Sequence, residues 1–275
     1  MAVKNIKFNS RPFEIIAGNK VFTENELSGE IIISNEENAS HPEYLCDAGF
    51  AKWNLKYDVI KDYLEGYENQ TDKWFPIGMR SCFSGSINFD GIDYIVEPKK
   101  SAGYIDRYWA KTFPEKWFHI SSSTLTSQIS GKTLFNSGFT VQGAFDNKIS
   151  FLGDFEGSDI LFCADAPKRL YSVMWNCVEA PDLDEDEEKR LHWSASFNSK
   201  FWVIDIDLYC KIKALYNRIL ELPEGQRKVL NVVQSATGIG EIKLYRKNKN
   251  DLEQIELARI SNAVCEFGHT EVSMK

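Results

Sequence analysis

Short segments in which apolar and polar residues alternate recur along most of this chain of 275 residues. Alternation with a period of two places one set of side chains on each face of an extended chain, which indicates half-buried β-strands. Turn-forming residues separate the segments at close intervals. The clearest segments are 7–18, 28–37, 45–57, 79–86, 87–96, 117–125, 132–142, 149–152, 159–162, 169–178, 192–197, 201–210, 241–246 and 252–260. The pattern predicts an all-β fold, a barrel or a sandwich.

Several stretches between these segments give local predictions. Asp90-Gly91 predicts the two-residue turn of a hairpin, and residues 248–251 predict a second hairpin. Residues 58–73 are polar and irregular, which indicates a loop. Gly238-Ile239-Gly240 leads into the strand 241–246. This segment lacks the third Gly and the helix that a dinucleotide-binding site needs. Residues 211–222 have near-helical apolar spacing, so the pattern alone allows a helix there.

Composition excludes several classes of protein. The net charge is −8, which argues against nucleic-acid binding and against docking to anionic lipid through basic residues. The six cysteines are scattered, without a C-x-x-C pair or histidines at metal-ligand spacing, so we interpret them as reduced thiols of a cytoplasmic protein with no metal site. The N-terminus has no apolar signal core, and no segment has the length of a membrane span.

The densest aromatic segment is Ser101–Thr126. Large rings with apolar faces alternate there with ionisable groups, a mixture that few plain cores require. The rings are Tyr104, Tyr108, Trp109, Phe113, Trp117 and Phe118, and the ionisable residues are Asp106, Arg107, Glu115 and His119. The segment predicts a ring-lined cavity with a few polar groups directed into it.

This segment resembles the signature of the tocopherol cyclase-like family, in which a SYAEKNWG-x-SFP-x-x-WFW pattern follows a G-x-I-x-x-x-G-x-x-Y strand pair. The strand pair here runs from Gly85 through Ile87 and Gly91 to Tyr94. The signature positions present here are Tyr104, Asp106, Arg107, Trp109, Phe113, Pro114, Trp117 and Phe118. Asp106, Arg107 and Trp109 also match the W-x-D-R-E-W segment of the related carotenoid-hydratase and AttH-like proteins. Three positions depart from the family: Tyr108, Ala110 and His119.

The resemblance implies two lipocalin-like antiparallel barrels in tandem. Residues 1–100 would form part of the first barrel and residues 101–275 the second, and residues 211–222 would be two further strands. The Trp-rich strands that usually open the family are missing, so either the gene product is truncated or the first barrel is incomplete. An incomplete barrel leaves strand edges unpaired, which predicts self-association through such an edge.

The family's chemistry implies roles for the residues in the signature. The expected activity is acid-catalysed cyclisation or hydration of an alkene in a prenylated or polyene substrate, an intramolecular lyase or isomerase reaction without a cofactor. Asp106 would be the acid, because burial among rings raises the pKa of a carboxyl and keeps it protonated. Tyr104 would relay a proton or orient the substrate, and His119, on the same strand face as Trp117, would be a general base. The expected substrate-binding residues are Trp109, Phe113, Trp117, Tyr108 and Arg80.

Each of these residues also has a purely structural interpretation. Asp106 can pair with Arg107 at a strand bend, the tryptophans and Tyr104 can simply pack, and His119 can be hydrogen-bonded without further function. The departures at the signature and the missing opening strands favour an alternative function: a lipocalin-type carrier of a hydrophobic or isoprenoid ligand that performs no chemistry.

Overall fold

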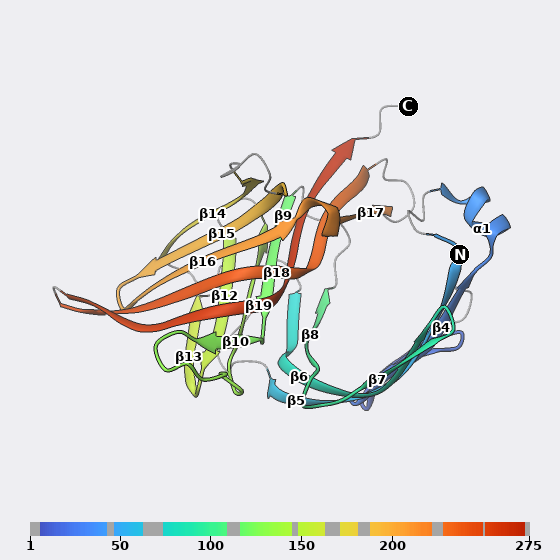
Figure 1. Cartoon of the computed structure of the whole chain (residues 1–275), viewed down its shortest axis with the longest axis horizontal. Helices are drawn as coiled ribbons and strands as arrows, with labels where there is room; N and C mark the ends of the chain where they lie inside the picture. Colours follow the sequence, from blue (N-terminus) through green and yellow to red (C-terminus); the bar gives the residue numbers. More distant parts are fainter. Residues whose placement is uncertain are drawn as a thin grey trace. The chain divides into compact units, whose positions relative to one another are not determined.

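The computed structural model describes residues 6–42, 47–62, 74–108, 116–144, 148–162, 171–180, 188–221, 228–249 and 251–272. Most of these residues lie in antiparallel strands, so the predicted all-β class is confirmed (Figure 1). The chain forms two compact units: unit 1 contains Met1–Ile60 and Ser81–Gly103, and unit 2 contains Lys61–Arg80 and Tyr104–Lys275. This division differs from the predicted one mainly because Lys61–Arg80 belongs to unit 2.

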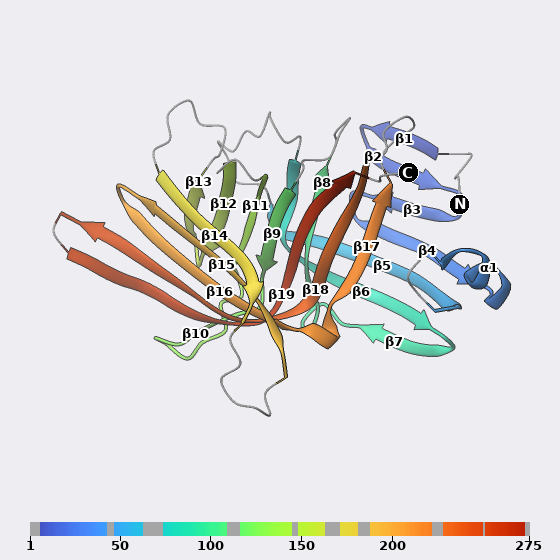
Figure 2. The ribbon, with the colours of Figure 1, turned by 90° about the horizontal axis from the view of Figure 1, so that it is seen from above.

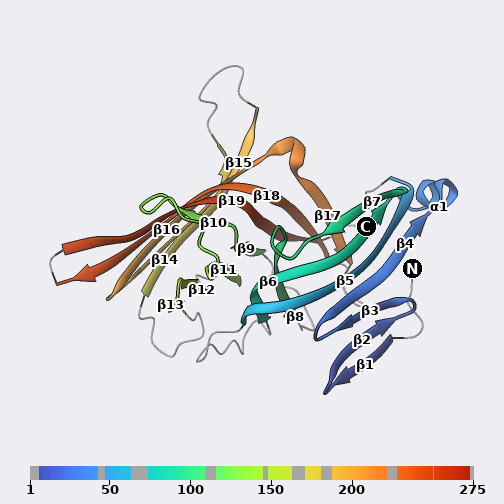
Figure 3. The same ribbon diagram turned by 60° about the horizontal axis from the view of Figure 1, so that its bottom comes forward.

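The first eight strands form one sheet in which β1 to β7 follow each other in chain order and β8 pairs with β6. Figure 3 shows β1 to β5 as successive neighbours, and the sheet curls into a half-barrel, as expected for an incomplete first barrel (Figure 1). The elements are β1 (Ile6–Ser10), β2 (Phe13–Ala17), β3 (Lys20–Thr23), β4 (Glu26–Ile33), α1 (Asn35–Ser40), β5 (Gly49–Asp62), β6 (Trp74–Phe89), β7 (Ile92–Val96) and β8 (Ala102–Tyr108).

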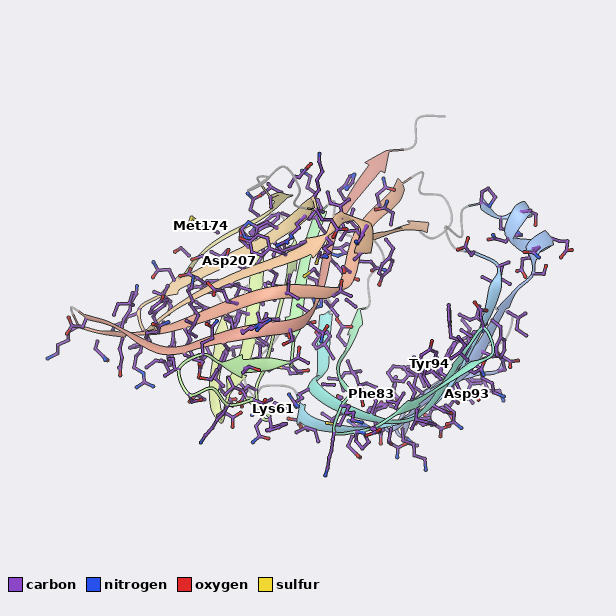
Figure 4. The ribbon with its side chains drawn as sticks, in the orientation of Figure 1. Lys61, Phe83, Asp93, Tyr94, Met174 and Asp207 are labelled. Atoms are coloured by element: carbon purple, nitrogen blue, oxygen red, sulfur yellow. The ribbon has the colours of Figure 1, made fainter. Side chains whose placement is uncertain are left out.

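A row of aromatic rings holds the strands of unit 1 together on one face of this sheet. Phe13 contacts Phe22 at a centroid distance of 5.2 Å, and Tyr57 contacts Phe22 at 6.3 Å. Tyr57 also contacts Phe83, which is labelled in Figure 4, at 5.7 Å. Edge-to-face and tilted pairs at such distances are favourable beyond the area that they bury. Further along the sheet, apolar side chains such as Ile95 remain exposed, and self-association through this unit stays a prediction.

The remaining strands form an eleven-stranded sheet in unit 2. Its main path is β13-β12-β11-β9-β19-β18-β16-β15-β14, with β10 paired to β19 and β17 paired to β18 (Figure 2). The elements are β9 (Lys116–Ser122), β10 (Leu125–Ser127), β11 (Gly138–Ala144), β12 (Lys148–Phe155), β13 (Ser158–Phe162), β14 (Tyr171–Glu179), β15 (Arg190–Ser199), β16 (Trp202–Lys211), the 3-10 turn η2 (Ile212–Ala214), β17 (Tyr216–Glu221), β18 (Lys228–Asn248) and β19 (Asp251–Val272).

Both hairpins predicted from turn residues are confirmed. β6 pairs with β7 up to Phe89↔Ile92, and Asp90 and Gly91 adopt positive φ values of 47° and 83°. A Gly tolerates such a φ without steric cost, and Asp is among the residues that tolerate it best. β18 pairs with β19 up to the turn that follows Asn248.

Three local predictions need correction. Residues 58–62 are not loop but the end of β5, while 63–73 lie outside the described residues. The strand predicted over 132–142 begins only at Gly138, because the chain before it turns and makes a single bridge between Thr133 and Thr126. Over residues 211–222 the pattern alone allowed a helix and the resemblance implied two strands, whereas the described part of this stretch contains a 3-10 turn followed by one strand, β17.

Gly238 and Gly240, expected to lead into the strand 241–246, lie inside β18, which is 21 residues long. The β18–β19 register shifts between Ser235 and Gly238 and again between Gly238 and Gly240. A Cβ at position 240 would lie 1.9 Å from the backbone oxygen of Asp207 on β16. Glycine is therefore required there by the close approach of β16 and β18, and not by a turn.

The helix and the 3-10 turn in the described ranges are both too short and too polar to cross a membrane.

Candidate functional site

Strand β9 is buried on both faces, and the two faces have different chemistry. After the exposed Lys116, every residue up to Ser123 is buried. Phe118 and Ile120 belong to the apolar core of unit 2. Because side chains alternate, Trp117, His119 and Ser121 lie on the opposite face. The prediction that Trp117 and His119 face the same side is thus borne out by their burial and their strand spacing.

Several of the predicted site residues come together on this second face, which we call the polar face of β9. The ring of Tyr104 on β8 contacts the imidazole of His119 at a centroid distance of 5.5 Å. Trp117 lies against Gly268 of β19, where a Cβ would be 2.9 Å from the indole. The guanidinium of Arg80 on β6 donates a hydrogen bond to the backbone oxygen of Ser123. Tyr104, His119, Trp117 and Arg80 therefore gather around one strand.

Asp106 does not have the surroundings expected of the catalytic acid. It lies two residues after Tyr104 on β8, but its side chain is exposed. The expectation of a carboxyl buried among rings is therefore wrong, since water reaches this side chain and removes the desolvation that the argument required. Of the other predicted residues, Trp109, Phe113 and the side chain of Tyr108 lie outside the described part of the chain.

Two further residues extend the polar face of β9 onto β11. Thr140 pairs directly with Ser121, and Gln142 pairs with His119. In the described structure, Nδ1 of His119, Oγ of Ser121 and Oγ1 of Thr140 are buried without a hydrogen-bond partner. Ser121 could have been found by its spacing from His119, whereas Thr140 depends on long-range strand pairing that no local pattern shows.

The other face of the unit 2 sheet is apolar and rich in aromatic rings. Phe151 on β12 contacts Phe139 at 6.2 Å, Phe162 at 6.0 Å and Phe197 at 5.5 Å. All four side chains are at most 4% exposed. These rings fill the space between the strands by contacting each other, so this part of the interior is a packed core.

The inward-facing side chains of β14 are less buried than the rest of this core. Its inward-facing residues Tyr171, Val173, Trp175 and Cys177 pack against the core but are only partly buried. Trp175 contacts Phe118 at 5.2 Å. In a closed barrel four successive inward positions would be fully buried, whereas these four side chains contact both the core and solvent.

The position of β14 in the sheet explains this exposure. β13 and β14 are the two ends of the main strand path, and among the described strands no ladder joins them. Tyr171 bridges the two ends: its ring contacts Phe162 of β13 at 5.0 Å, and its hydroxyl donates to the backbone oxygen of Ile149 at 2.8 Å. Side-chain contacts of Tyr171 thus connect one end of β14 to β13 and β12.

The inward face of β14 is uncharged. Burial, with a smaller contribution from Cys210, raises the pKa of the Cys177 thiol to about 12, so the thiol stays protonated at neutral pH. Cys82, Cys177, Cys210 and Cys265 are free thiols. Within the described ranges no three His, Cys, Asp or Glu side chains are arranged to hold a metal ion.

Comparison of the chain with models of known families, with curated proteins and with solved structures finds no match. The resemblance to the tocopherol cyclase-like family therefore stays a prediction.

Proposed function

We propose that unit 2 is a carrier for a hydrophobic small molecule, which binds along the inward face of β14. The observation that carries this proposal is the partial exposure of Tyr171, Val173, Trp175 and Cys177, four neutral side chains in contact with a ring-rich core. Covering apolar surface of this kind contributes about 25 cal/mol for each Å² removed from water. An apolar ligand would cover the four inward-facing side chains of β14 that the sheet leaves partly exposed.

The chemistry of this face favours an apolar ligand over a polar one. Tyr171 already uses its hydroxyl to hold Ile149, and Trp175 presents an aromatic surface beside Phe118. Flat rings and short aliphatic side chains suit an extended chain with double bonds, because π-faces and C–H groups pack closely. A prenylated or polyene compound, the class expected from the sequence, meets these requirements.

Truncating Trp175 tests the proposal. We expect Trp175→Ala to weaken binding of a polarity-sensitive hydrophobic fluorophore by about tenfold, because a large part of the aromatic contact is lost. Met174→Ala on the same strand is the matched control, since Met174 is 73% exposed and points away from the core (Figure 4). Equal affinities in wild type, Trp175→Ala and Met174→Ala, together with no apolar compound in a solvent extract of the protein, would contradict carriage.

The cyclase-like activity is the second candidate, and substituting Asp106 separates it from carriage. A carrier returns its prenylated ligand intact after incubation, and Asp106→Asn, at an exposed position, should leave ligand retention unchanged. The measurement is mass spectrometry of the extracted ligand. A cyclised or hydrated product that forms with wild type and disappears with Asp106→Asn would instead establish an enzyme with Asp106 as its acid.

A further inference from the structure

The polar face of β9 contains a group of buried atoms that the fold itself does not satisfy. The three atoms are Nδ1 of His119, Oγ of Ser121 and Oγ1 of Thr140, on side chains that are 4%, 2% and 0% exposed. Buried polar atoms in native proteins nearly always have a hydrogen-bond partner. Three exceptions on adjacent positions of two paired strands indicate that something outside the polypeptide binds there.

Other buried hydroxyls of unit 2 show that the fold can satisfy such groups. Ser122 Oγ, one position along β9, donates to the backbone oxygen of Asn262 at 2.6 Å. Ser137 Oγ bonds to the carboxylate of Glu156 at 3.1 Å, and Ser235 bonds to Thr237 at 3.0 Å. Among these buried hydroxyls of the described structure, Ser121 and Thr140 on the polar face of β9 therefore differ from Ser122, Ser137 and Ser235 in having no partner.

The three unsatisfied atoms are close enough for one small molecule to reach them all. Ser121 and Thr140 are directly paired, which places their Cβ atoms about 5 Å apart. His119 lies two residues before Ser121 on the same face, a separation of about 7 Å along a strand. A molecule with two or three hydroxyl groups on neighbouring carbons spans these distances.

The chemistry of the site selects a neutral ligand. Each Ser or Thr hydroxyl can donate one hydrogen bond and accept others, and a neutral imidazole offers one donor and one acceptor. One charge of each sign lies nearby. Glu266 on β19 is the strand partner of His119, and the Arg80 guanidinium donates a hydrogen bond to the backbone oxygen of Ser123. These two charges are opposite in sign, so neither an anionic nor a cationic ligand is favoured by the net charge around the site. The ring of Tyr104 contacts His119, and Trp117 lies two residues before His119 on the same strand face.

We propose that the polar face of β9 is a binding site for a small neutral polyhydroxylated compound, held by His119, Ser121 and Thr140. This site lies on one face of the sheet, and the inward-facing residues of β14 lie on the other, core face. The polyol site is therefore independent of the hydrophobic carriage proposed above. Unit 2 would thus bind two chemically different molecules on the two faces of one sheet.

The direct test uses the full chain, purified without polyols and labelled at its histidines, with glycerol and D-glucose as separate probes. We expect one of them to shift an imidazole signal that His119→Gln removes. The response to the two probes distinguishes a three-carbon polyol from a sugar. If neither probe changes the His119 signal, and a crystal grown without polyols shows only ordered waters bridging the three side chains, the proposal is overturned.

Two substitutions that preserve side-chain volume closely make the test specific. Ser121→Ala and Thr140→Val should each weaken polyol binding by about tenfold, the loss expected for one hydrogen bond. Without polyol, both variants should melt at or above the temperature of wild type, because each removed hydroxyl had no partner. Ser122→Ala is the matched control: it should melt at a lower temperature but bind polyol normally. Binding that is unchanged in Ser121→Ala and Thr140→Val would overturn the proposal, and folding of each variant is checked by circular dichroism.

Discussion

Replacing Phe151 with alanine should lower the free energy of unfolding by about 3–5 kcal/mol, the range measured for truncating a large buried ring. Phe151 is 0% exposed and contacts rings on three other strands: Phe139 on β11, Phe162 on β13 and Phe197 on β15. Truncation would leave a cavity that these rings cannot fill, because they are held by their own strands. Urea denaturation followed by circular dichroism measures the change.

The matched control for this prediction is Phe135→Ala. Phe135 lies in the turn before β11 and is 63% exposed, so its removal should change the free energy of unfolding by less than about 0.5 kcal/mol. A second comparison is Phe151→Leu, which keeps most of the apolar volume and should cost clearly less than the alanine variant. If Phe151→Ala were no more destabilising than Phe135→Ala, the ring contacts around Phe151 would not be the packed core described above.

The strands of this core could be predicted from the sequence because apolar and polar residues alternate within each of them. In β15 and β16 the inward residues alternate strictly, with Trp193, Ala195 and Phe197 on one strand and Ile204 and Ile206 on the other. A period of two fixes which side chains share a face whatever the partner strand is. The alternation therefore predicted the fold class and the strand segments.

The loop predicted over residues 58–73 shows where this logic fails. Residues 58–62 continue β5 although their side chains are mostly polar and exposed. β5 as a whole lies between β4 and β6 in the sheet, and pairing between backbones does not require an apolar face. Gly240, which precedes the predicted strand 241–246, lies within β18 and is required there by the close approach of β16. Pairing partners are distant in sequence, and a local pattern does not contain them.

The candidate site was predictable to the same extent. The spacing of Trp117 and His119 correctly placed them on one face of one strand. The density of rings around Asp106 predicted that this residue is buried, but it is exposed, because burial depends on which strands cover β8 and not on the neighbours in sequence. Thr140 could not be found at all without the register between β9 and β11.

Lys61, near the end of β5, forms an ion pair with a buried carboxylate of unit 2 (Figure 4). Its Nζ lies 2.5 Å from Oδ2 of Asp154, a carboxylate that is 2% exposed, and 3.2 Å from Oδ1 of Asp159, which is 56% exposed. The backbone N–H of Gly157 donates to the other oxygen of Asp154 at 2.8 Å. Burial alone would raise the pKa of Asp154, but Lys61, Gly157 and Asp159 together outweigh it, and the pKa is lowered.

Replacing Lys61 with methionine should therefore lower the free energy of unfolding near neutral pH by about 2–4 kcal/mol, because it leaves a buried carboxylate without its cation. Lys61 is 28% exposed, which places the expected cost below that of a fully buried pair. The control Asp159→Asn removes an exposed partner of the same lysine and should cost about 0–1 kcal/mol. Urea denaturation of the three proteins measures both differences.

The pH dependence of this difference identifies its cause. A carboxyl whose pKa is lowered by folding contributes stability above its ordinary value of 3.8, and this contribution is lost as the pH falls through the lowered value. Without Lys61, only Gly157 and Asp159 oppose the effect of burial, so the pKa of Asp154 is higher in the variant than in wild type and the group is protonated at a higher pH. The stability gap between wild type and Lys61→Met should therefore close as the pH falls toward and below the ordinary value. A gap that stays constant over that range would mean that Lys61 stabilises unit 2 through the packing of its aliphatic chain and not through its charge.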